Sequence, residues 1–292
     1  MSVNFIDLTT VAAVNNLLSQ ASGTDSDLIQ TEITNLSRYI LTKTSRNYLG
    51  GFLNYSETYN GNGSDTLMLK NYPILAVSSL SIGTMSVPQS PGTNQSGWVI
   101  DTSGSGAALA LRGWGRSNVA FSNWNTGDSP WSGYGNAPPL GQGPYCFYEG
   151  VMNVSVAYTA GMVTDQRNEQ HTVPASGAYT VTVTNSATFW TDLGVTTTTG
   201  VAVTGYTVAN GIYTLPATYA GQNLLFNYQY GAVPQDLNEC ATKVVATYYR
   251  RPKYLDQSSQ MQPGIGTTAY NRSEWAPECV SIIDAYKRRF LD

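Results

Sequence analysis

The chain has 292 residues, which is the length of about two domains. Its hydrophobic content of 41% is enough to form cores, and its net charge of −4 offers no basic footprint for gripping nucleic acid. The charges lie mainly towards the two ends, because residues 61–232 hold 11 Asp, Glu, Lys and Arg side chains and the much shorter segment 233–292 holds 15. Catalysis needs titratable groups, so this distribution argues against an enzyme and favours helices at the ends with strands between them.

Targeting and cysteine signals are weak. Residues 1–18 lack a basic region followed by a continuous apolar run, so we expect no signal peptide and synthesis in the cytoplasm. No apolar run approaches the ~20 residues that span a membrane, so no membrane contact is expected. Cys146, Cys240 and Cys279 have no metal-type spacing, which argues against a zinc site and a disulfide framework. Cys240 and Cys279 fall on apolar helical faces and are expected to be buried.

Two helices are predicted in the N-terminal segment 1–51. Residues 9–19 place four apolar side chains on one helical face, namely Val11, Val14, Leu17 and Leu18. Thr24–Asp27 then offers caps and negative charge to a second helix, which Gly50-Gly51 ends. The apolar residues of this second helix are Leu28, Ile29, Ile33, Leu36 and Ile40.

Residues 52–161 are predicted to form a β-rich region. Glu57–Gly63 has the composition of a turn, and Leu75–Ile82 has that of a strand. Trp98–Asp101 and Leu109–Leu111 flank a Gly-Ser turn and predict a hairpin. Residues 112–148 show no period and are expected to be a long functional loop. A last strand is predicted with one face made of Met152, Val154, Val156 and Tyr158.

Residues 162–232 are predicted to be a separate small antiparallel β-sandwich or barrel. Asn210-Gly211 lies between two short β-type runs and is a strong hairpin signal. The segment from Leu224 to Tyr230 alternates apolar with amide side chains, which is typical of a half-buried strand.

Helices return in residues 233–292. One is predicted to begin at Pro234 and to end before Pro252, with a single apolar stripe. That stripe consists of Leu237, Cys240, Ala241, Val244, Val245 and Tyr248. Residues 256–271 are polar and glycine-rich and are expected to form a loop. A final helix is predicted from Pro277, with Val280, Ile283 and Tyr286 on one face. The predicted fold class is therefore α+β, with a helical core built from both chain ends.

Few residues suggest chemistry. Asp165, Glu169 and His171 are candidates for a hydrolase cluster, but no Ser stands in a G-x-S-x-G context, and one His cannot build a usual zinc site. Carboxylate pairs at predicted helix starts are explained by the helix dipole; they are Asp25 with Asp27, and Asp236 with Glu239. We therefore predict no catalytic residue, no metal ligand and no cofactor.

Aromatic residues of the middle region indicate a contact surface. A sugar-stacking platform would suit a β-rich glycan- or receptor-binding module, which is the alternative function, and Trp98 belongs to this candidate platform. Aromatics are also enriched at protein interfaces, and we favour contacts with neighbouring proteins. The candidate residues are Trp114, Trp124, Trp131 and Tyr134.

Six blocks follow one another in a characteristic order. They are Glu57–Gly61, Leu67–Leu69 with Tyr72-Pro73-Ile74, Val77–Ile82, Trp98–Asp101 with Leu109–Leu111, Val154–Gly161, and Val233–Leu237 with Val244–Tyr249. In order and spacing they resemble the head–tail connector, or head-completion adaptor, proteins of tailed bacteriophages. The chain departs from that family by the insertion of residues 162–232 and by the enlarged segment 112–148.

The resemblance implies a non-enzymatic virion protein at the head–tail interface. Such proteins form a ring, commonly of twelve copies, between the portal protein and the tail or nozzle proteins, and DNA passes through the ring without sequence-specific binding. By resemblance, the C-terminal segment docks on the portal. The residues at that position are Tyr286, Lys287, Arg288, Arg289 and Phe290. They could equally be charges that match the dipole of the last helix.

Overall fold

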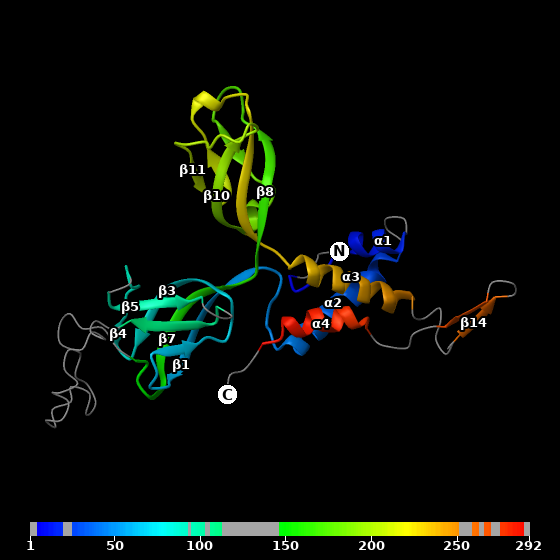
Figure 1. Cartoon of the computed structure of the whole chain (residues 1–292), viewed down its shortest axis with the longest axis horizontal. Coiled ribbons are helices and arrows are strands. Elements are labelled where there is room, and N and C mark those ends of the chain that lie inside the picture. The colour runs from blue at the N-terminus through cyan, green and yellow to red at the C-terminus, as the bar shows by residue number, and fades with distance from the viewer. Residues whose placement is uncertain are drawn as a thin grey trace. The chain divides into compact units, whose positions relative to one another are not determined.

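The structure is a computed structural model that describes residues 5–19, 25–92, 95–102, 106–112, 146–250, 259–262, 266–269 and 275–288. The chain divides into two compact units. The first contains Met1–Phe52 and Met162–Asp292, and the second is the continuous segment Leu53–Gly161. Figure 1 shows the helices from the two chain ends side by side, with the strands collected in separate groups.

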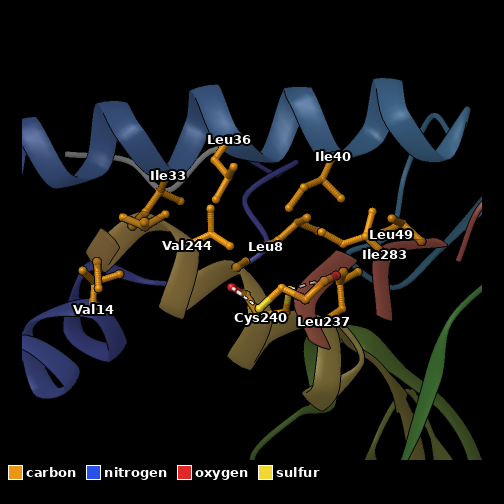
Figure 2. Close-up of a cluster of buried hydrophobic side chains, with 14 of the residues drawn as sticks. Leu8, Val14, Ile33, Leu36, Ile40, Leu49, Leu237, Cys240, Val244 and Ile283 are labelled. Carbon is orange, nitrogen blue, oxygen red and sulfur yellow. Dashed lines mark hydrogen bonds between the residues drawn. The ribbon is translucent and has the colours of Figure 1, made fainter. Parts of the chain in front are cut away.

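Four helices of the described chain share one buried cluster of the first unit. They are α1 (Val11–Leu18), α2 (Ser26–Thr44), α3 (Gln235–Arg250) and α4 (Pro277–Ala285). Helix α3 contacts the other three. In Figure 2 the side chains of α2 point towards those of α3 and α4, with Leu8 between them. The stripe predicted for α3 is confirmed, because its residues from Leu237 to Val245 are buried.

Three apolar residues expected on buried helical faces are exposed. Leu17, Leu28 and Val280 have exposed fractions of 47%, 52% and 43%. Each of these helices carries apolar residues over a wider arc than the neighbouring helices cover. Helical periodicity alone therefore predicts burial for residues that face solvent. The burial predicted for Cys240 and Cys279 is confirmed, and the two thiols are free and each faces the other's backbone carbonyl.

The second unit holds two antiparallel sheets around its own core. Its strands are β1 (Phe52–Gly61), β2 (Thr66–Met68), β3 (Ile74–Ile82), β4 (Met85–Ser86), β5 (Gly97–Asp101), β6 (Ala108–Arg112) and β7 (Gly150–Gly161). One sheet has the order β1-β7-β3-β4, and the other has the order β2-β6-β5. The predicted hairpin is confirmed by the pairing of β5 with β6.

Glu57–Gly61 was expected to be part of a turn, and this is wrong. These residues continue β1, because Tyr59 is buried in the core and its hydroxyl bonds Glu57. The strand predicted around Met152 is confirmed from Val154 to Tyr158, whereas Met152 itself is exposed and has a φ of 52°.

Residues 163–231 form two further small sheets within the first unit. The strands are β8 (Val163–Thr172), β9 (Thr180–Thr182), β10 (Phe189–Thr197), β11 (Thr207–Ala209), β12 (Ile212–Thr214) and β13 (Asn223–Gly231). The sheet orders are β10-β13-β8 and β11-β12-β9. The predicted Asn210-Gly211 hairpin is confirmed, with both residues at positive φ. In β13, Leu224, Phe226 and Tyr228 are fully buried.

The predicted fold class, an α+β protein organised around a helical core from both chain ends, is wrong. The part of the chain that the structure describes is β-rich, with 39% strand against 27% helix. In that part the helices form one of three separate hydrophobic clusters, since each pair of sheets buries a core of its own. Strands also replace part of the expected loop 256–271, where β14 (Ser259–Gln262) pairs with β15 (Gly266–Ala269).

Candidate functional site

Three carboxylates in the β-sheets accept hydrogen bonds from tyrosine hydroxyls, namely Glu57, Glu169 and Asp192. Glu57 accepts from Tyr59 and from Tyr158, the latter at 2.7 Å. Asp192 accepts from Tyr206 at 2.5 Å and from Tyr213 at 2.8 Å. Burial, followed by the bond to Asp192, raises the pKa of Tyr206 to about 12. These acids therefore stabilise sheets whose tyrosines would otherwise bury an unpaired hydroxyl.

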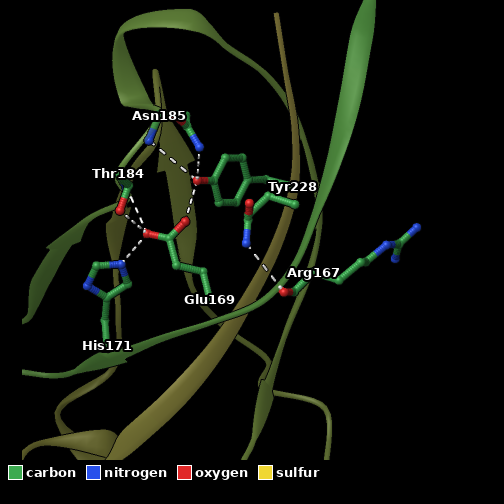
Figure 3. A network of polar contacts seen from close by, with 7 residues as sticks. Arg167, Glu169, His171, Thr184, Asn185 and Tyr228 are labelled. Atoms are coloured by element: carbon green, nitrogen blue, oxygen red, sulfur yellow. Dashed lines mark hydrogen bonds and ion pairs between the residues drawn. The ribbon is translucent and has the colours of Figure 1, made fainter. Parts of the chain in front are cut away.

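Glu169 lies at the centre of the most extensive of these networks, which Figure 3 shows. One carboxylate oxygen accepts from the backbone N–H of Thr184 at 2.8 Å, from the Thr184 hydroxyl at 2.7 Å and contacts Nε2 of His171. The other oxygen accepts from the Tyr228 hydroxyl. Partial burial raises the pKa of Glu169, but the bonds from Tyr228, His171 and Thr184 outweigh it and lower the pKa to about 2.

The hydrolase candidates are only partly brought together. Glu169 and His171 are in contact, whereas Asp165 bonds Arg167 at 2.7 Å and Gln229 at 2.9 Å. A general base needs a free lone pair aimed at its substrate, and both oxygens of Glu169 are engaged within the sheet. Within the described residues, no group of three or more His, Cys, Asp or Glu side chains could hold a metal ion.

One of the candidate aromatic residues lies in a hydrophobic core, and the others lie outside the residues that the structure describes. Trp98 is 5% exposed and belongs to the hydrophobic cluster of the second unit, so its ring is not available as a stacking platform. The predicted contact residues lie outside the described residues; they are Trp114, Trp124, Trp131 and Tyr134.

The root of the C-terminal segment is held against the helices by three hydrogen bonds. The Tyr286 hydroxyl donates to Asp236 at the start of α3, at 2.8 Å. Nε of Arg46 donates to the Tyr286 carbonyl at 2.7 Å, and the Arg288 backbone N–H donates to the Thr44 carbonyl at 2.7 Å. Lys287 is exposed between these anchored residues. Arg289 and Phe290 lie outside the described residues.

Sequence reasoning missed three residues that hold this segment: Thr44, Arg46 and Asp236. Asp236 is explained in the sequence by the helix dipole alone, and no local pattern links the end of α2 to residue 286. An unsatisfied carbonyl is expected at every helix C-terminus, and here the Arg288 N–H satisfies one of them. The association of these residues is therefore a tertiary feature.

Tyr286→Phe is expected to loosen the root of the C-terminal segment by about 1 kcal/mol, because a hydrogen bond to a carboxylate is lost. Hydrogen exchange at the Arg288 amide should accelerate by about fivefold. Tyr249→Phe is the matched control, since it removes a Tyr–Asp bond to Asp25 elsewhere on the helices and should leave that amide unchanged. Equal acceleration in both variants would contradict the assignment.

No protein-family model matches this sequence, and a search of curated proteins found no match either. Among the helices of the described residues, none has both the length and the apolar character needed to cross a membrane.

Proposed function

We propose that the protein is a head–tail adaptor of a tailed bacteriophage virion, without enzymatic activity. It forms a ring of about twelve copies between the portal protein and the tail or nozzle proteins, and DNA passes through the ring. The ordered sequence blocks motivate this function. The observation that carries it in the structure is the anchored root at Tyr286–Arg288, from which a basic segment extends.

Anchoring matters for docking because a segment that leaves from a fixed point loses less conformational entropy when it binds. Three hydrogen bonds hold Tyr286 and Arg288 against α3 and the end of α2, so the backbone at Lys287 has a defined position. Basic and aromatic side chains of the kind found in Arg289-Phe290 are frequent anchors at protein interfaces.

The chemistry of the acidic residues also supports a structural role. Glu57, Glu169 and Asp192 each accept hydrogen bonds from tyrosine hydroxyls within the sheets. A glycan-binding function is not favoured by any observed site, since the described tryptophan of the candidate platform, Trp98, is buried in a core.

Electron microscopy and native mass measurement of the purified chain test the ring. We expect closed rings of about twelve subunits, alone or on the portal protein, because a ring needs a heterologous interface on both sides of each subunit. A strict monomer or a trimer that binds glycans would rule out the adaptor.

Deletion of residues 287–292 tests the docking role. Attachment to the portal protein, measured by co-sedimentation, is expected to fall at least about tenfold because the basic segment is lost. The charge-matched control is Lys243→Glu on the exposed face of α3, which should leave attachment unchanged. Undiminished attachment after the deletion would contradict docking through this segment.

A further inference from the structure

Helices α2 and α4 border a groove with a volume of about 390 Å³. Its lining consists of Tyr39, Lys43, Trp275, Val280, Ile283 and Asp284. Both helices belong to the first unit, and Ile283 is part of its buried cluster, so the floor of the groove is continuous with the hydrophobic core.

The walls of the groove are apolar and preformed. Two apolar side chains of the lining are exposed. Tyr39, which is aromatic, and Val280, which is aliphatic, have exposed fractions of 46% and 43%. The Trp275 ring packs edge-on against Tyr39, with ring centroids 5.3 Å apart, and its indole N–H donates to the Tyr248 hydroxyl at 3.4 Å. The Trp275 ring, which these contacts hold in place, and the exposed side chain of Val280 together suit one apolar or aromatic side chain from a partner.

One end of the groove is cationic. Lys43 lines it and is exposed, and Arg46 follows just past the end of α2. Lys287 and Arg288 follow Asp284 where α4 ends. The bonds from Arg46 to the Tyr286 carbonyl and from Arg288 to the Thr44 carbonyl hold these two helix ends together. Lys43 of the lining and the three basic residues at this junction therefore outnumber the two acidic residues near them, which are Asp284 of the lining and Asp236, the acceptor of the Tyr286 hydroxyl.

This combination fits an acidic protein segment better than nucleic acid. Binding to a phosphate backbone commonly uses six or more Lys or Arg contacts along a continuous track. Here the greater part of the lining is apolar and offers no charge contacts to a phosphate chain. A short peptide can place one apolar side chain in the groove and its carboxylates at the cationic end only.

We propose that this groove and its cationic end bind a short acidic segment of a partner protein, with an apolar or aromatic residue seated against Trp275. The inference rests on the proposed adaptor function, in which the partner is the portal protein. It makes Lys43 and Arg46 of α2 part of the docking surface together with Lys287 and Arg288, so the C-terminal segment does not dock alone.

A peptide-binding experiment on the full chain tests the site without a portal protein. The probe is a synthetic peptide with Phe-Leu flanked by two Glu on each side, compared with the same peptide carrying Lys in place of Glu and with a short DNA duplex. We expect the acidic peptide to shift the Trp275 indole N–H signal in NMR, assigned with Trp275→Phe. The Lys peptide should leave that signal unchanged.

Charge reversal locates the contact. The double variant Lys43→Glu/Lys287→Glu should weaken binding of the acidic peptide at least about tenfold, because two favourable charge contacts become repulsive. Lys243→Glu on α3 is the control for a charge reversal outside the groove and should bind as the wild type does. Unchanged binding by the double variant, or equal binding of the acidic and Lys peptides, would overturn the inference. Tighter binding of the DNA duplex would make this surface a nucleic-acid interface instead.

The two proposals fail separately. Rings that attach to the portal protein equally well with Lys43→Glu/Lys287→Glu would refute the composite docking surface and leave the adaptor function standing. A chain that binds the acidic peptide in the groove but forms no ring and does not attach to the portal protein would refute the adaptor function alone.

Discussion

Gly61→Ala is expected to destabilise the second unit by more than about 3 kcal/mol, which is the largest effect of a single methyl group that the structure indicates. A Cβ atom at this position would lie 1.6 Å from the Tyr148 carbonyl oxygen and 2.7 Å from the carbonyl carbon. Both are backbone atoms, and Asn153 ties them to Gly61 by accepting from the Gly61 N–H and donating to the Tyr148 carbonyl. The backbone of β1 or of the segment before β7 must therefore move.

Hydrogen exchange of the β7 amides at Val154 and Val156 measures this effect in the second unit separately from the rest of the chain. Gly92→Ala is the control, because a Cβ there meets no atom within 4 Å. That substitution should change the free energy of unfolding by less than about 0.5 kcal/mol. Similar exchange rates in Gly61→Ala and in the wild type would show that the approach of Tyr148 to Gly61 is not maintained.

The stability of the β8–β13 sheet is expected to fall by about 2–3 kcal/mol as the pH drops from about 4.5 to about 2. Hydrogen bonds hold the pKa of Glu169 at about 2, below its ordinary value of 4.5. A lowered folded-state pKa means that the contribution is fully present above pH 4.5 and is lost as the pH falls through about 2. Urea titrations across this range, followed by the NMR indole signal of Trp190 in β10, measure the loss.

Glu169→Gln isolates this contribution. The amide does not ionise, so the variant should be about 2 kcal/mol less stable near neutral pH and should lose most of the acid dependence. The substitution is needed because the pKa of Asp165 in the same strand is also lowered, by hydrogen bonds from Gln229 and Arg167. Glu278→Gln on the exposed surface of α4 is the control. A wild-type acid dependence in Glu169→Gln would assign the effect to other groups.

Three acidic residues of the β-sheets have structural hydrogen-bond partners. Sequence composition alone argued that too few acids were present for catalysis, and the structure shows that Glu57, Glu169 and Asp192 are engaged with buried or half-buried tyrosines. Those pairings join residues up to 101 positions apart, as between Glu57 and Tyr158. A pairing of this kind leaves no local signal, because each tyrosine reads simply as an apolar strand residue.

Elements with a strong local pattern were predicted correctly. The Asn210-Gly211 hairpin depends on two residues that tolerate positive φ, and the stripe of α3 depends on a period of 3.6 residues. Elements that depend on distant partners were not. Glu57–Gly61 has a turn-like composition but belongs to a strand that pairs with β7, and the polar segment Ser259–Gln262 pairs with Gly266–Ala269. Composition is a poor guide where a strand is stabilised by its neighbour in the sheet.

At the candidate site, too, the sequence identified only the residues that a local pattern marks. The sequence identified the basic segment from Lys287 onwards, since adjacent charges are visible in a single chain. It did not identify Lys43 or Arg46 as neighbours of that segment, because the bond between Arg46 and Tyr286 spans 240 residues.

By itself, the sequence determined the helical ends, the hairpins with local turn signals and the scarcity of titratable groups in the middle, because these follow from neighbours in the chain. Only the tertiary structure decided that strands outweigh helices in the described residues, which bury three separate hydrophobic clusters, and that Glu57, Glu169 and Asp192 accept hydrogen bonds from tyrosines. The physical reason is that burial and hydrogen-bond satisfaction are settled between residues far apart in sequence, where no local period records them.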